Sequence, residues 1–274
     1  MKWEDVMSGS VKLVTSAETQ EFCRETAIEN YQLIDVRQPG EYQSGHIPGA
    51  KLAPLGELVS GQVELSKSKP VIVYCHSGGR SAAAAGWLVE QGFEKVLDVA
   101  GGFSSWNGLA AQGPVEMNLN LIKDSAEFPD AFAMAYAMED GLQRFYLKLA
   151  PKMDDPKLTE ILTRMASFED NHKENLKAKA TNPDDLKIEE DNQLMEGGFY
   201  VDQLVEQVAG RIDSVEQLFS MSLAIEAQAY DFYTRLAGHS KNPEVKALFL
   251  EMADEEKGHL NLLSKEMDEL LASA

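Results

Sequence analysis

The first third of the chain alternates short apolar runs with amphipathic stretches. Residues 32–36 and 71–74 are rich in Val, Ile and Leu and are bounded by Gly, Pro and polar turns, which is the pattern of strands. The second run is apolar throughout, as in a strand buried on both faces of a parallel sheet. The alanine-rich segment 82–90 after it predicts a helix. We therefore expect an α/β domain whose parallel sheet is flanked by helices.

The chain is helical in character from Asp124 onward. We expect four helices, at about 124–150, 155–180, 213–238 and 242–271. Capping residues mark their starts, namely Asp124-Ser125 with Glu127, Asp155-Pro156, Asp213-Ser214 and Asn242-Pro243. Residues 181–212 are a long acidic connection, interrupted by Gly197-Gly198 and carrying a short helix near 200–209. This pattern predicts an all-α four-helix bundle with one crossover.

Periodicity is lost between these two parts, over residues 108–118, which contain Gly113-Pro114. We place the α/β domain at 1–113, a linker at 114–123 and the bundle at 124–274. Residues 1–115 carry 9 basic and 13 acidic residues, whereas the remainder carries 16 and 32. The helical part therefore holds most of the net charge of −20.

Composition excludes several classes of protein. A net charge of −20 over 274 residues repels phosphate backbones, so nucleic acid is not an expected partner. The two cysteines, Cys23 and Cys75, are too few for a disulfide framework and fit a reducing cytosol. No run is long enough to cross a bilayer, and the N-terminus lacks the build of a signal peptide. We expect a cytoplasmic protein without a membrane partner.

Cys75 lies where the apolar strand turns into the alanine-rich helix. Backbone N–H groups at a helix N-terminus favour an anion and lower the pKa of a thiol, so this position predicts a nucleophilic thiolate. Arg80 adds a positive charge for an anion or a persulfide. In this interpretation the other residues of the loop bind the substrate; these are His76, Ser77, Gly78, Gly79 and Ser81.

Residues 11–113 resemble the rhodanese (sulfurtransferase) family in three segments. These are Asp35-Val36-Arg37 with Glu41 and 45–50, the Cys75–Ser81 loop, and Gly101-Gly102-Phe103 with Trp106. The resemblance implies that Cys75 takes sulfane sulfur from thiosulfate or another donor as a persulfide and passes it to a thiophilic acceptor. Related phosphatases have five residues between Cys and Arg, whereas this loop has four, so phosphatase activity is a minor alternative. We interpret Asp35, Arg37, Glu41 and His46 as structural salt bridges and caps.

The helical part is an internal repeat with a shift of 87 residues. Phe132 aligns with Phe219, Pro156 with Pro243, and Met165 with Met252, without a gap. The repeat preserves one Glu on the first helix and Glu-x-x-His on the second, so the set is Glu139, Glu169, His172, Glu226, Glu256 and His259. Residues at i and i+3 share a helix face, and this set matches ferritin-like di-iron and di-manganese sites. Tyr146 and Tyr233 lie on the same helix faces as Glu139 and Glu226, respectively. Either they form hydrogen bonds that support the metal site, or they pack in the core.

Residues 124–272 resemble the rubrerythrin branch of the ferritin-like family, with those six residues at the positions of its di-iron ligands. Two features depart from the family. Ala229 stands where a further ligand Glu is usual, and the chain has no four-cysteine electron-transfer domain. The resemblance implies two irons, with manganese as an alternative because the oxygen-rich ligand set accepts both. It also implies a homodimer.

The sequence therefore predicts a sulfurtransferase fused to a di-iron unit that reduces peroxide or dioxygen with electrons from an external donor. In the alternative, the helical unit is a redox or iron sensor, or an iron-handling module, that regulates the sulfur site. A further hypothesis is that the Cys75 persulfide itself delivers electrons to the irons.

Overall fold

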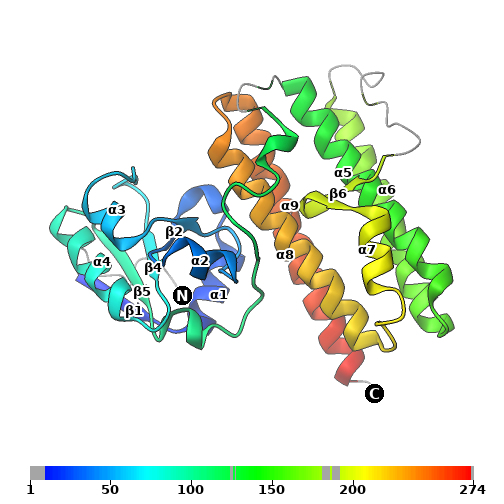
Figure 1. The fold of residues 1–274 in the computed structure, drawn as a ribbon, viewed down its shortest axis with the longest axis horizontal. Coiled ribbons are helices and arrows are strands. Elements are labelled where there is room, and N and C mark those ends of the chain that lie inside the picture. Colours follow the sequence, from blue (N-terminus) through cyan, green and yellow to red (C-terminus); the bar gives the residue numbers. More distant parts are fainter. Residues whose placement is uncertain (1–9, 124–125, 127, 181–185, 187–191, 273–274) are drawn as a thin grey trace. The chain divides into compact units, whose positions relative to one another are not determined.

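The chain divides into two compact units, one ending at Met117 and the other beginning at Asn118 (Figure 1). The computed structural model describes residues 10–123, 126, 128–180, 186 and 192–272. The division falls within the predicted linker 114–123. Asn118 is already tied to the second unit, because its Nδ2 donates a hydrogen bond to Gly198 O at 3.1 Å. The predicted cap at Asp124-Ser125 with Glu127 lies outside the described residues.

The first unit is built on a parallel sheet with the strand order β1-β5-β4-β2-β3. The strands are β1 (Ser10–Val14), β2 (Gln32–Asp35), β3 (Lys51–Leu52), β4 (Val71–Tyr74) and β5 (Lys95–Val99). The predicted strands β2 and β4 are confirmed, whereas β1, β3 and β5 were not predicted. All four residues of β4 are buried because this strand lies at the centre of the sheet.

Four helices and two short turns accompany this sheet. They are α1 (Ser16–Glu25), η2 (Ile28–Asn30), α2 (Pro39–Gln43), α3 (Leu55–Val59), α4 (Gly79–Glu90) and η3 (Gly102–Ser105). Helix α4 packs Ala84 and Leu88 into the same core as Val73 of β4. It begins three residues before the predicted start at 82, so Arg80 and Ser81 lie in its first turn. The glycine loop after Cys75 is therefore shorter than expected.

The second unit is a bundle of four long helices, as predicted. They are α5 (Phe128–Leu149), α6 (Pro156–Lys179), α8 (Val215–His239) and α9 (Pro243–Ala272), with the turns η4 (Leu119–Leu121) and η5 (Ala150–Lys152). Three predicted N-caps are confirmed: Asp155 accepts from Lys157 N, Ser214 from Gln217 N, and Asn242 from Glu244 N. Helix α5 packs against α6, and α8 against α9, so each copy of the repeat is one helical hairpin. Among the described residues, no helix is both long and apolar enough to cross a membrane.

The crossover between α6 and α8 contains a small hairpin that the sequence did not predict. Strands β6 (Leu194–Met195) and β7 (Phe199–Tyr200) pair antiparallel around the turn η7 (Glu196–Gly198) and lead into α7 (Val201–Val208), which confirms the predicted short helix. Gly197 and Gly198 have φ values of 69° and 74°, in the left-handed region that favours glycine. The hairpin lies against α5 and α8 (Figure 1), so the crossover reaches the interior of the bundle.

Candidate functional site

Cys75 sits between the end of β4 and the start of α4, as the sequence predicted. Its Sγ accepts a hydrogen bond of 3.1 Å from Gly78 N–H. The residue is 1% exposed, while His76, Ser77 and Gly79 above it face solvent. The thiol therefore lies beneath an exposed loop, with a backbone donor directed at its sulfur.

Hydrogen bonding favours the charged form of this thiol. Burial alone would raise the pKa of Cys75, but the N–H and O–H groups of Ser81, whose Oγ bonds Gly78 O at 3.1 Å, and the backbone N–H groups of Gly78 and Ser77 lower it below its ordinary value. Each donor stabilises a thiolate more than a thiol. The first turn of α4 thus makes Cys75 a better nucleophile at neutral pH than an ordinary cysteine.

Arg80 is anchored beside the thiol by Glu41. Its two terminal nitrogens lie 2.6 and 2.7 Å from the Glu41 carboxylate oxygens. This pairing is the main reason why the pKa of Glu41 is lowered to about 2, and the Cys75 thiolate also raises the pKa of Arg80. A bidentate pair fixes the plane of the guanidinium, so Arg80 presents a positive charge at the mouth of the loop.

The remaining polar residues singled out in this unit make structural bonds, as predicted. Arg37 forms a buried ion pair with Asp35 at 2.7 Å and donates to Gly45 O at 2.6 Å. His46 Nδ1 lies 2.9 Å from Tyr42 O. Both side chains are almost inaccessible, which separates them from the exposed loop above Cys75.

The second unit brings all six predicted ligands together inside the bundle. Glu139 comes from α5, Glu226 from α8, and the two Glu-x-x-His pairs from α6 and α9; their ligand atoms form the groups Glu139, Glu169, His172 and Glu226, Glu256, His259. Within each group the atoms lie within 4.8 Å of one another. All four carboxylates are at most 4% exposed. The repeat therefore places two equivalent ligand groups on facing hairpins.

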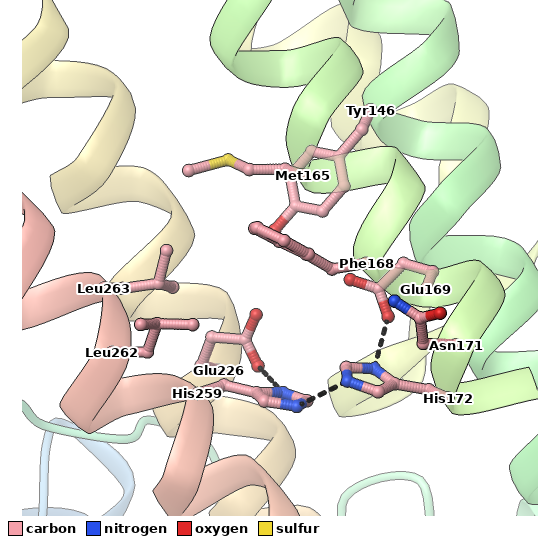
Figure 2. Close-up of a pocket in the computed structure, with 10 residues that line it drawn as sticks. All are labelled: Tyr146, Met165, Phe168, Glu169, Asn171, His172, Glu226, His259, Leu262 and Leu263. Carbon is pink, nitrogen blue, oxygen red and sulfur yellow. Dashed lines mark hydrogen bonds and ion pairs between the residues drawn. The ribbon is translucent and has the colours of Figure 1, made fainter. Parts of the chain in front are cut away.

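The two imidazoles meet between these groups (Figure 2). His172 Nδ1 lies 3.0 Å from Glu169 Oε2, and His259 Nδ1 lies 3.3 Å from Glu226 Oε2. Glu256 Oε2 also lies 3.3 Å from His259 Nδ1. The Nε2 atoms are 3.1 Å apart, and the rings stack with centroids 4.3 Å apart. Each ring is thus oriented by carboxylates of its own group.

A cavity of about 110 Å³ lies beside the imidazoles. Figure 2 shows its lining, in which aromatic and aliphatic side chains surround a few ligand atoms: Tyr146, Met165, Phe168, Glu169, Asn171, His172, Glu226, His259, Leu262 and Leu263. This space is large enough to admit small molecules of the size of water beside the ligand atoms.

The donor set fits a pair of divalent cations. Burial raises the pKa of Glu169 to about 8 and that of Glu256 well above its ordinary value. Glu139 Oε2, which lies 3.5 Å from His172 Nδ1, and Glu256 Oε1 accept no hydrogen bond among the described residues. Buried carboxylates need either a proton or a cation, and carboxylate with imidazole suits iron or manganese. The clusters can therefore bind metal.

One residue of this cluster, Glu196, was missed by sequence reasoning. It lies in η7, is 0% exposed, and its ligand atom is within 4.8 Å of those of Glu139 and Glu256. No motif marks it, because it stands alone in an acidic connection. The one local signal is its place between an apolar residue, Met195, and the glycine pair.

The two repeated tyrosines are both buried near the carboxylates. Tyr146 lines the cavity, at 1% exposure. Tyr233 is 0% exposed, packs on Phe249, and its hydroxyl makes no hydrogen bond within the described part of the chain. Tyr146 is therefore placed to touch a molecule in the cavity, whereas Tyr233 belongs to the core.

Comparisons with known proteins agree with this division into two units. Residues 18–109 match the family model of the rhodanese-like domain, and residues 217–273 match that of rubrerythrin. A thiosulfate sulfurtransferase, GlpE, of Pseudoalteromonas translucida is 40% identical over 78 residues, which cover 28% of this chain and 74% of that protein. A sulfurtransferase of Allochromatium vinosum is 36% identical over 88 residues, covering 31% and 82%.

The match to another relative covers a smaller share of that relative. YrkF of Bacillus subtilis is 41% identical over 80 residues, which cover 29% of this chain and 43% of that protein. The chain thus spans less than half the length of that relative. All three similarities cover at most about a third of this chain.

Proposed function

Since the chain belongs to the rhodanese-like family and carries a rubrerythrin domain, we propose that it transfers sulfane sulfur through a persulfide on Cys75 and reduces peroxide or dioxygen at a di-iron centre. The observation that carries the first part is the Gly78 N–H bonded to Cys75 Sγ. The observation that carries the second is the pair of Glu–Glu–His groups inside the bundle.

The Cys75 thiolate attacks the outer sulfur of thiosulfate. A Cys75–sulfur bond forms, the sulfur–sulfur bond of thiosulfate breaks, and sulfite leaves with the electron pair. A thiol acceptor, as its thiolate, then attacks the outer sulfur of the persulfide and releases Cys75 as a thiolate. Arg80 and the loop N–H groups stabilise the bound anion and the persulfide charge.

Replacement of the nucleophile tests the sulfur reaction. Cys75→Ser should reduce thiosulfate-dependent sulfur transfer to cyanide to background, because a hydroxyl does not ionise at neutral pH. Cys23→Ser is the matched control and should keep full activity. Mass spectrometry should show a gain of one sulfur on thiosulfate-treated wild type. Full activity in Cys75→Ser would overturn this part of the proposal.

The six residues of the two groups would hold the metal centre. Bound there, a pair of irons would supply two electrons that, with two protons, reduce hydrogen peroxide to two water molecules, and an external donor would replace the electrons. Glu139 and Glu169 orient His172, while Glu226 and Glu256 orient His259. The apolar walls of the cavity limit the space available to water and to larger molecules.

Turnover tests the redox reaction. The iron-loaded full chain with an added reductant should consume many equivalents of peroxide, and Glu169→Ala should lose this activity together with bound iron. A single stoichiometric oxidation of the wild type would instead support a sensor. Unchanged turnover in Cys75→Ser would exclude the persulfide as the electron donor.

A further inference from the structure

We propose that Glu196 is a further metal ligand, delivered to the metal pair by the crossover hairpin. This inference rests on the metal centre of the proposed function and assigns it a carboxylate outside the repeat. Glu196 has no counterpart in the 87-residue repeat, since residue 109 is Leu109, in the first unit.

The first argument is that neither oxygen of Glu196 receives a hydrogen bond from a donor group of the described residues. The side chain is 0% exposed, and the side chain within hydrogen-bonding range of it is another carboxylate, that of Glu256. A buried polar group without a partner is costly, and a charged one more so. A bound cation would give both oxygens a partner.

The second argument is the position of Glu196 between the two ligand groups. Its ligand atom forms a third cluster with Glu139 and Glu256, within 4.8 Å. Glu139 also belongs to the His172 group, and Glu256 to the His259 group. Glu196 thus has one neighbour in each of the two ligand groups. Its carboxylate would therefore be available to a cation held by either group.

The third argument is that the hairpin is held closely against α5. Asn192 Nδ2 donates to Ala137 O at 2.8 Å, in the turn of α5 that precedes Glu139. A Cβ on Gly141 would lie 2.7 Å from both Leu194 C and Met195 Cα, so only glycine allows this approach. Met195, the residue before Glu196, is 0% exposed. The carboxylate is therefore carried on an anchored backbone rather than on a free loop.

Cobalt titration of the full chain tests this assignment without relying on activity. Wild type, Glu196→Gln and the control Glu206→Gln, an exposed residue of α7, are made metal-free and titrated with Co²⁺ under anaerobic conditions. Gln keeps the shape of Glu but is a weak ligand. We expect two equivalents in the wild type and in Glu206→Gln. In Glu196→Gln we expect an altered visible spectrum and a second equivalent at least about 10-fold weaker, because loss of a direct ligand should cost no less than loss of a residue that only supports a ligand.

The outcomes separate the two proposals. A wild type that binds no Co²⁺ removes the metal centre itself. A wild type with two equivalents, and Glu196→Gln equal to Glu206→Gln in affinity and spectrum, overturns only the role of Glu196. Should Glu196→Gln fail to fold, a crystal structure of the cobalt-loaded wild type decides: an oxygen of Glu196 at about 2.0–2.2 Å from a cobalt ion supports the assignment, and one beyond bonding distance refutes it.

Discussion

Replacing Gly141 by alanine should destabilise the bundle, although the same change in an ordinary helix is stabilising. Gly141 lies inside α5, where alanine is favoured over glycine by about 1 kcal/mol. A Cβ at this position would overlap Leu194 O and lie 2.7 Å from Leu194 C and Met195 Cα, against an ordinary contact of 3.4 Å or more. The hairpin backbone must therefore retreat from α5 by at least about 0.7 Å, since the contact with Leu194 O is closer still than those with the two carbons.

The magnitude can be worked out from this displacement. Retreat by about 0.7 Å stretches the 2.8 Å hydrogen bond from Asn192 to Ala137 O to its limit, and its loss costs about 1 kcal/mol. Overpacking of a buried contact costs about 1–3 kcal/mol. After subtraction of the helix gain, we expect Gly141→Ala to lower the free energy of unfolding by about 1–3 kcal/mol. It should also weaken metal binding, because the displaced hairpin carries Glu196.

Urea unfolding of the metal-free full chain, followed by circular dichroism at a helical wavelength, measures this effect. Gly238→Ala is the matched control, since it lies in α8 with no atom within 4 Å of the added Cβ. The control should be neutral or more stable by up to about 1 kcal/mol. If Gly141→Ala were stabilised as much as Gly238→Ala, the close approach of hairpin and helix would be refuted.

Three further predictions concern the thiol, the ligand cluster and a helix cap. Ser81→Ala should raise the pKa of Cys75 and shift the pH profile of sulfur-transfer kcat/KM upward, because it removes a donor that lowers this pKa; an unshifted profile would contradict it. In metal-free protein, burial raises the pKa of Glu169 to about 8, and carboxylate hydrogen bonds outweigh burial to raise that of His172 to about 10. Both groups bind protons more tightly when folded, so the Tm of chelated protein should fall as pH rises from 4.5 towards 10, and metal should suppress this fall; a rising Tm would contradict it. Asp155→Ala should cost about 1 kcal/mol in urea unfolding, because it removes the N-cap bond to Lys157 N.

The ligand groups could be anticipated from sequence because they belong to a repeat. Because the repeat has a constant shift of 87 residues without a gap, the two helical hairpins are expected to bury equivalent faces. Glu-x-x-His spacing then fixes two side chains to that face. The Cys75 loop could also be predicted from the sequence, because a buried strand that ends in a glycine-rich turn places the residues after it at the carboxyl end of the sheet.

Glu196 could not be predicted because its position depends on a tertiary contact. The hairpin that carries Glu196 packs its backbone directly against α5 at Gly141, where any larger residue would clash with it. Gln228 occupies the equivalent place in α8, so the repeat is broken at the residue where the hairpin packs. That break in the repeat marks the place of the hairpin contact but does not point to Glu196 itself. Strands β1 and β5 were missed because a charged residue interrupts the apolar run of each, Lys12 and Asp98, and β3 was missed because it has only two residues.

The account depends most on whether the buried carboxylates and imidazoles bind a metal pair. The direct measurement is the iron content of the full chain after anaerobic reconstitution and removal of loose iron, determined by mass spectrometry for wild type and for the double variant Glu169→Ala with Glu256→Ala. We predict two irons per wild-type chain and none retained by the variant. A wild type without iron, or a variant that keeps both, would contradict the account.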